Sequence, residues 1–271
     1  MKPWHAWGAT LVSLLLSGAA GPARADVAIF VHGYLSGDDA WEQSGVTPAL
    51  KTKGWESGGS VTAMAQGGLQ FRNTPPKGAH AFFLADLPSE APLLTQANAL
   101  KEILLAIRAQ RGTERTFLIG HSAGGVVARL LMVREPGLSI HTLITIASPH
   151  LGTDKAEVAG LIASTPLSMM APMMGMDTLN RSKSLYEDLA RERPGTFLHW
   201  LNHQPHPKAR YLSIVRRDTP SLLGDNLVPV WSQDMAQVTA LRTLTPETIT
   251  QGQDHTLTPQ DGAEVARILA P

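Results

Sequence analysis

The feature that most constrains this sequence is a pentapeptide, Gly-His-Ser-Ala-Gly, at residues 120–124. It follows a short apolar run, residues 116–119, and precedes a helical pattern. A strand, a tight turn and a helix form a nucleophile elbow, in which a strained backbone lifts a serine hydroxyl clear of the sheet. Small residues must flank that serine, and glycine stands two positions away on each side. The pattern predicts Ser122 as a nucleophile at a helix N-terminus, where negative charge is stabilised. The alternative is a glycine-rich turn with an incidental serine.

Composition excludes several classes of function. The chain has 271 residues, of which 43% are hydrophobic and 17% charged, as in an ordinary domain with a large core. Lysine plus arginine equals aspartate plus glutamate, at 23 each, and no basic patch stands out, so we expect no nucleic-acid partner. Cysteine is absent from the sequence, which excludes disulfides, thiolate metal sites and a cysteine nucleophile.

The N-terminus has the pattern of a signal peptide. Lys2 supplies a positive charge, residues 9–16 form a short apolar core, and residues 23–25 read Ala-Arg-Ala. We expect residues 1–25 to be removed after Ala25 and the protein to be exported, to a periplasm or to the medium. The apolar core is short for a membrane span, and an uncleaved anchor is the alternative interpretation.

Short apolar segments alternate with helical patterns from residue 26 to the end. This alternation predicts one α/β domain, residues 26–271, with a mainly parallel sheet covered by helices on both faces. Active sites of such sheets lie at the carboxyl ends of the strands. We expect strands at 27–31, 60–64, 81–84, 116–120, 141–147, 210–215 and 241–250, and helices at 40–51, 95–111 and 259–269, with Thr258 as the last N-cap.

The alternation of strand and helix patterns stops in a segment of about residues 153–206, where no strand pattern occurs. Helical pieces and a methionine cluster replace it, and we interpret the segment as a helical cap inserted over the strand ends. Methionine fits irregular apolar shapes, so the cluster either lines an acyl pocket or fills the core under the cap. The cluster comprises Met169, Met170, Met173, Met174 and Met176.

A serine nucleophile needs a histidine base, which needs an orienting carboxylate. In an α/β sheet with this elbow the chain order is serine, acid, histidine. Four histidines follow the 141–150 segment, and three of them, His199, His203 and His206, fall in the predicted cap or its exit. His255 lies in a polar turn between the last strand pattern and the last helix, so we predict it as the general base.

Two aspartates after the 210–215 strand compete for the role of the acid. Asp225 begins a turn that continues into a stiff apolar segment, which holds a carboxylate at a defined place. Asp218 belongs to a charged run that looks solvated. We therefore predict Asp225, with Asp234 and Asp254 as weaker candidates.

An oxyanion hole needs two convergent backbone N–H groups. The residue after the nucleophile, Ala123, supplies one. The loop after the first strand supplies the other, because Gly33 permits a close backbone approach, and we expect the amide of Tyr34. We interpret His32 as a structural hydrogen-bonding residue rather than a second base.

Taken together, these segments resemble an α/β-hydrolase of the bacterial lipase type, and are similar to GPI-inositol-deacylase-like esterases. The resemblance is carried by FVHGY at 30–34, GHSAGG at 120–125, IASPHLGT at 146–153 and DNLVPVWSQ at 225–233. It implies the α/β-hydrolase fold, with Tyr34 in the oxyanion hole and Ser122, Asp225 and His255 as the triad. It also implies that the 146–153 segment is a structural loop at a strand end beside the site, in which His150 is not catalytic.

The sequence departs from the family pattern at two points. Asn226 stands where glycine is common, and the Asp-His-Thr context of His255 lacks the pattern of calcium-binding lipases, which argues against a calcium site. The expected activity is hydrolysis of carboxylic esters, with a small-molecule or lipid ester as substrate and transient contact with a lipid interface. No cofactor or metal ion is expected. An amidase, peptidase or thioesterase would use the same triad, and a non-catalytic binding protein is the alternative from another class.

Overall fold

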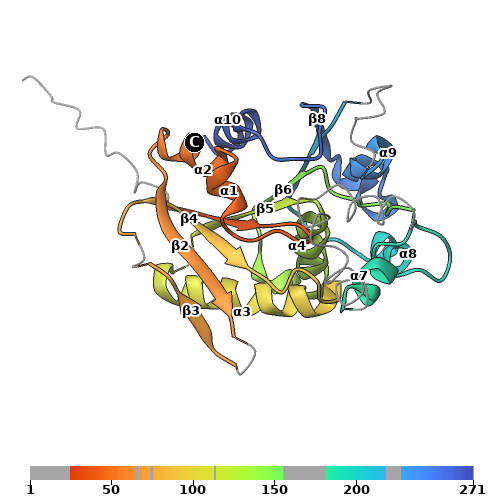
Figure 1. Cartoon of the computed structure of the whole chain (residues 1–271), viewed down its shortest axis with the longest axis horizontal. Helices are drawn as coiled ribbons and strands as arrows, with labels where there is room; N and C mark the ends of the chain where they lie inside the picture. Colours follow the sequence, from red (N-terminus) through yellow and green to blue (C-terminus); the bar gives the residue numbers. More distant parts are fainter. Residues whose placement is uncertain are drawn as a thin grey trace, which may run out of the picture.

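A central sheet organises the computed structural model, which describes residues 25–64, 67–73, 76–112, 114–154, 181–217 and 227–270. In this part of the chain the sheet has eight strands in the order β3-β2-β4-β1-β5-β6-β7-β8 (Figure 1). Every neighbouring pair is parallel except β2 and β3. The strands are β1 (Asp26–Val31), β2 (Glu56–Ala63), β3 (Leu69–Phe71), β4 (His80–Asp86), β5 (Arg115–His121), β6 (Thr142–Ile146), β7 (Arg210–Val215) and β8 (Glu247–Thr250).

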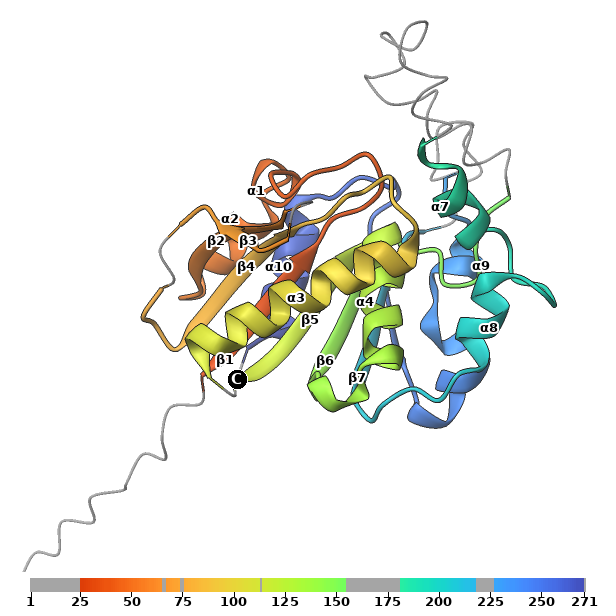
Figure 2. The same ribbon diagram turned by 90° about the horizontal axis from the view of Figure 1, so that it is seen from below.

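Helices cover both faces of the sheet, as the alternating pattern predicts. Helices α3 (Leu93–Arg111) and α4 (Ala123–Arg134) lie on one face, and α1 (Ala40–Gln43), α2 (Val46–Lys51) and α10 (Pro259–Ile268) lie on the other (Figures 1 and 2). The other helices in the described residues are α7 (Lys183–Asp188), α8 (Phe197–His203) and α9 (Val230–Gln233), with short 3-10 turns η1 (Pro136–Leu138), η3 (Met235–Gln237) and η4 (Thr239–Leu244).

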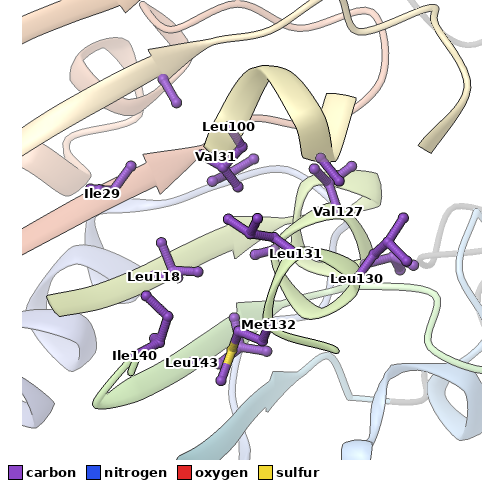
Figure 3. Packing of buried hydrophobic residues seen from close by; sticks show 14 of the residues in the cluster. Ile29, Val31, Leu100, Leu118, Val127, Leu130, Leu131, Met132, Ile140 and Leu143 are labelled. Carbon is purple, nitrogen blue, oxygen red and sulfur yellow. The ribbon is translucent and has the colours of Figure 1, made fainter. Parts of the chain in front are cut away.

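The two faces of the sheet form two apolar clusters because side chains alternate along a strand. In β1, Ile29 and Val31 pack toward α3 and α4, while Ala28 and Phe30 pack toward α1, α2 and α10. Figure 3 shows the first cluster, where β1 and β5 meet Leu131 of α4. Burying one aliphatic side chain completely stabilises the folded state by about 1.5–3 kcal/mol relative to leaving it exposed. A strand buried on both sides is therefore expected to be apolar, and β1 is apolar from Val27 to Val31, while its first residue, the buried Asp26, is paired with Arg115.

Two sequence predictions differ from the structure. The helix expected at residues 40–51 is divided into α1 and α2, because Gly45 has a left-handed backbone with φ of 82°. The strand expected at residues 241–250 is shorter, because residues 239–244 form the 3-10 turn η4 and only Glu247–Thr250 pairs with β7. The other expected strands and helices agree within a few residues, strand β3 was not expected, and Thr258 caps α10 as expected.

The carboxyl ends of the central strands meet at one edge of the sheet. Val31 of β1 is in register with Gly120 of β5, and His121 is in register with Ile146 of β6. Ile146 in turn is in register with Ile214 of β7. Residues that follow these strands are therefore brought together, although the chain separates them by up to about 180 residues.

The predicted cap lies partly outside the described residues. All five methionines of the cluster fall in residues 155–180, for which no structure is described. The described remainder, residues 181–206, contains α7 and α8, and the cap as a whole stays a prediction. None of the helices that the structure describes combines the length and the apolar character that a membrane span requires.

Candidate active site

The pentapeptide forms the strained turn that its sequence predicts. Ser122 follows β5 directly and precedes α4, with φ of 51° and ψ of −129°. A positive φ is rare for a residue with a side chain and persists only where the surroundings impose it. Its amide donates to the carbonyl oxygen of Ile146 at 2.9 Å, and its carbonyl accepts from the amide of Gly125 at 3.1 Å. The turn is thus tied to β6 and to the first turn of α4.

Gly124, two residues after the serine, is required because two backbone segments approach each other closely there. A Cβ at position 124 would collide with the carbonyl oxygens of Val31 and His32. The start of α4 is therefore pressed against the end of β1. This contact places the serine turn beside the loop that follows β1.

The serine hydroxyl contacts His255 across 133 positions of sequence. The distance from Ser122 Oγ to His255 Nε2 is 2.9 Å, which is hydrogen-bonding distance. Ser122 is 7% exposed and His255 is 9% exposed. The structure therefore brings these two predicted residues together where both have little access to solvent, and there electrostatic interactions are stronger than in water.

A second histidine holds the backbone of the first. His121 Nε2–H donates to the carbonyl oxygen of His255 at 2.8 Å, and the two rings lie 5.1 Å apart. Burial, together with the nearby charges of His255 and Arg216, lowers the pKa of His121 to about 3. His121 therefore stays neutral and remains a donor to the His255 loop over the physiological range of pH.

A buried ion pair anchors the same loop from the other side. Arg216 follows β7 and makes two bonds to the carboxylate of Asp261 in α10, at 2.7 and 3.0 Å. The same guanidinium donates to the carbonyl oxygens of Gln251 and Thr256, which flank His255. Both side chains of the pair are fully buried. The loop is thus fixed at its two ends to β7 and α10.

The loop after β1 reaches the serine turn as the sequence predicts. A Cβ at position 33 would lie 2.9 Å from Ser122 Cβ, so this loop passes beside the nucleophile without room for a side chain. Ala123 is the first residue of α4, and first-turn amides have no partner within their own helix. Tyr34 comes next in the loop, and its hydroxyl contacts Ser182 at 3.0 Å and Tyr186 at 2.6 Å.

His32 has a structural place, as expected from the sequence. Its Nε2 accepts from the amide of Leu87 at 3.0 Å, which leaves the proton on Nδ1, and that proton is donated to the carbonyl oxygen of Gly33 at 3.0 Å. Both ring nitrogens are therefore engaged in fixing the loop. His32 is not available as a base.

The predicted acid lies outside the described residues. Asp225 and its competitor Asp218 both fall in residues 218–226. Asp234 is described, and its Oδ1 accepts from the amide of Ala236 and the hydroxyl of Thr248, which makes it a local cap. Asp254, the other weaker candidate, is exposed.

The segment that follows Asp225 is firmly held. The side chain of Gln233 accepts from the amide of Arg216 at 2.8 Å and donates to the carbonyl of Val228 at 2.7 Å. The carbonyl of Ser232 accepts from the amide of His150 at 2.8 Å. This segment is therefore fastened to the ends of β6 and β7, at the edge that carries Ser122.

The other histidines considered in the sequence analysis lie away from the serine turn. His150 is fully buried, its Nε2 lies 3.0 Å from the hydroxyl of Thr145, and burial lowers its pKa well below the usual range. His199 and His203 belong to α8, and His206 follows it. Burial lowers the pKa of His206 to about 4. None of the four has a contact with Ser122 among the described residues.

Sequence reasoning assigned no role at this site to three residues near His255. His121 was visible in the pentapeptide, but its contact with the His255 loop depends on the fold. Arg216 and Asp261 are 45 positions apart, and nothing local indicates that they pair. The capping box of α10, in which Thr258 and Asp261 exchange bonds, is the one local clue that Asp261 is not solvated.

Comparison with known proteins supports this fold. Residues 89–158 match the family described as PGAP1-like alpha/beta domain. A gene product of Listeria innocua has a similar structure, with a TM-score of 0.63 at 16% identity over 89% of this chain and 92% of that chain. No curated protein matches the chain in sequence.

Two further similar structures have descriptions that name an activity. The lipase BlEst2 of Bacillus licheniformis, in mature form, has a TM-score of 0.52 at 16% identity, over 92% of this chain and 91% of that chain. The metagenomic carboxyl esterase MGS0156 has a TM-score of 0.52 at 14% identity, over 91% of this chain and 75% of that chain. With its largely parallel sheet and strained serine turn, the chain has the α/β-hydrolase fold and resembles the lipases and esterases that share it.

Proposed function

We propose that this protein is a serine hydrolase that cleaves carboxylic esters, with Ser122 as nucleophile and His255 as general base. The observation that carries the proposal is the 2.9 Å contact between Ser122 Oγ and His255 Nε2, made by a serine with a strained, positive φ. A serine hydroxyl becomes nucleophilic only when a base takes its proton, and this contact supplies the base.

The first half of the reaction forms an acyl-enzyme. Ser122 Oγ bonds to the ester carbonyl carbon while its proton passes to His255 Nε2, and the carbonyl electrons move onto oxygen. The amides of Ala123 and Tyr34 donate to that oxyanion. Each such donor contributes about 2.7–4 kcal/mol to lowering the barrier. The bond to the alcohol oxygen then breaks, and the leaving oxygen takes the proton from His255.

The second half releases the acid. Water attacks the acyl carbon, its proton passes to His255, and the bond to Ser122 Oγ breaks as the serine recovers a proton. Every proton and electron pair is accounted for by the ester, water and the protein. The proposed mechanism therefore needs no cofactor.

We assign Asp225 as the carboxylate that orients His255. The held segment that follows it, fastened by Gln233 and Ser232 at the edge that carries Ser122, supports this assignment. Asp234 is engaged with Ala236 and Thr248, which argues against it. Asp225→Asn should lower kcat by about 10⁴-fold, whereas Asp234→Asn and Asp218→Asn should not.

We propose lipid or acyl esters as the substrate class. The descriptions of two structural neighbours, a lipase and a carboxyl esterase, favour esters over amides and thioesters, which the same triad would cleave. Trp200 and Trp231 are each 42% exposed, and tryptophan suits a lipid–water interface. A panel of esters of rising chain length, with matched amides and thioesters, tests this. Activity that rises at a lipid interface indicates a lipase.

Export remains a proposal drawn from residues 1–25. Expression of the full chain in a bacterium, followed by mass measurement of the protein outside the cytoplasm, should give a chain that begins at Asp26. A full-length product retained in the membrane would support the uncleaved anchor instead.

A serine-reactive fluorophosphonate probe separates a hydrolase from a non-catalytic binding protein. Wild-type protein should be labelled, and Ser122→Ala should lose both labelling and the burst of product from an activated ester, with kcat lower by about 10⁶-fold. The exposed Ser57→Ala serves as the control and should keep full labelling. Labelling that persists in Ser122→Ala would remove Ser122 from its role.

A further inference from the structure

A cluster of three potential metal ligands lies outside the candidate active site. Glu192, His199 and His203 each offer one ligand atom, and these atoms all lie within 4.8 Å of one another. Glu192 Oε1 lies 3.7 Å from Nδ1 of His199. None of the three contacts Ser122 or His255, so no step of the proposed hydrolysis uses them.

The histidines share one face of a helix. His199 and His203 are four residues apart in α8, a spacing that places side chains one above the other, and their rings are 4.3 Å apart. Nδ1–H of His203 donates to the carbonyl of His199 at 2.7 Å, which leaves Nε2 with a free lone pair. Metal-bound histidines make this kind of bond with their second nitrogen.

The carboxylate is aimed at the histidines by a buried partner. Glu192 Oε2 accepts from Nδ2 of Asn202 at 2.9 Å, while Oε1 faces the two imidazoles. Asn202 is fully buried, and its Oδ1 accepts from Arg129 of α4 at 2.6 Å. The backbone of Glu192 is also fixed, because its amide donates to the carbonyl of Leu151 at 2.9 Å. The ligands therefore come from two held segments.

The donor set selects among metal ions. Two imidazoles and one carboxylate match Zn²⁺ and its neighbours Co²⁺ and Ni²⁺, whereas Ca²⁺ and Mg²⁺ prefer oxygen ligands throughout. Zn–N and Zn–O bonds of about 2.0–2.2 Å in tetrahedral geometry require atoms that are up to 4.8 Å apart to close by up to about 1.5 Å. The side chains are 35%, 45% and 21% exposed for His199, His203 and Glu192, which leaves room to turn and leaves the fourth position to water.

We propose that Glu192, His199 and His203 bind one Zn²⁺ ion that clips α8 to the segment preceding it. This segment forms a parallel bridge between Ala190 and Thr153, so the ion would join α8 to the chain that leaves β6. Such a clip stabilises the folded state because the unfolded chain does not hold the three ligands together. The proposal differs from the sequence expectation, which assigned these histidines no role and expected no metal.

Thermal unfolding of untagged protein, stripped with EDTA and desalted, tests the clip. Zn²⁺ at about 100 times its Kd should raise Tm by about 5–10 °C, and the same concentration of Ca²⁺ should not. Co²⁺ should bind with one-to-one stoichiometry and give the intense visible absorption of a tetrahedral site. A Zn²⁺ effect on Tm that Ca²⁺ reproduces would contradict the proposal.

Variants locate the ion. Glu192→Gln and His203→Gln preserve size and should each weaken Zn²⁺ binding at least tenfold, with circular dichroism and metal-free ester turnover unchanged. His141→Gln, which removes a histidine elsewhere on the surface, should keep wild-type affinity. Zn²⁺ affinity that is the same in both cluster variants as in the wild type would overturn the assignment. The Zn²⁺ affinities and the circular dichroism do not depend on the proposed hydrolase activity, so they test the metal site even if ester turnover is absent.

Discussion

Single residues set the geometry of the serine turn. Ser122 holds a backbone conformation that an isolated chain would avoid, and its neighbours impose it by contact rather than by preference. The clearest constraint is at position 124, where there is no space for a side chain between α4 and the end of β1. The turn therefore depends on the lack of a side chain at Gly124 as much as on the side chains that are present.

At this scale we predict that Gly124→Ala destabilises the protein. The added methyl group meets two backbone carbonyls, which cannot turn aside as a flexible side chain can, so the free energy of unfolding should fall by about 1–3 kcal/mol. Gly137→Ala is the matched control, because a Cβ there meets nothing within 4 Å. Urea unfolding of both variants measures the difference. Equal stability of the two variants would show that the elbow relaxes.

An ion pair between two elements holds the loop that carries His255. The Arg216–Asp261 pair joins β7 to α10 with both partners fully buried, whereas the Arg210–Glu247 pair joins β7 to β8 with side chains 42% and 50% exposed. Burial raises the pKa of the Asp261 carboxyl, but hydrogen bonds from Arg216 and Thr258 outweigh it, so that pKa lies below its usual value. Asp261 is thus charged in the folded state and depends on its partner.

This contrast predicts that similar substitutions in the two ion pairs lower the free energy of unfolding by unequal amounts. Asp261→Asn leaves the Arg216 guanidinium buried without a counter-charge and should lower the free energy of unfolding by about 3–5 kcal/mol. Glu247→Gln breaks the exposed pair and should change it by at most about 1 kcal/mol. Chemical denaturation at neutral pH makes the comparison. If the two variants lost the same stability, the buried pair would not anchor the loop.

The whole molecule carries several histidines that folding keeps neutral. Burial lowers the pKa of His121 to about 3 and of His206 to about 4, and it lowers that of His150 well below the usual range. In the unfolded chain a histidine titrates near pH 6.5. Between about pH 4.5 and 6 the unfolded state therefore binds more protons than the folded state.

The protein should accordingly lose stability on mild acidification. The stability that these neutral histidines contribute is complete above about pH 6.5 and falls as the pH drops below that value. Each neutral imidazole lowers the free energy of unfolding by about 1.4 kcal/mol per pH unit, so three of them lower it by up to about 4 kcal/mol per pH unit. Urea unfolding at pH 7 and pH 5.5 measures the slope, and His206→Asn should reduce it by about a third. Constant stability over this interval would contradict the prediction.

Much of the fold could be predicted from local pattern. The strand, turn and helix around Ser122, the long helix α3 and the capped start of α10 all follow from periodicity, small residues and capping chemistry over a few positions. Errors occurred where neighbours in space decide. The helix expected at 40–51 breaks at Gly45, and the last strand begins later than its apolar pattern indicates because residues 239–244 pack as a 3-10 turn.

By itself the sequence determined the kind of fold and the chemical types at its edge, because apolar alternation and steric limits act between close neighbours along the chain. Tertiary structure alone decided which polar groups meet. The contact of Ser122 with His255, the bond from His121 to the same loop, and the pairing of Arg216 with Asp261 each join distant positions. Such partners leave no local trace, since it is the register of parallel strands that brings their ends to one edge.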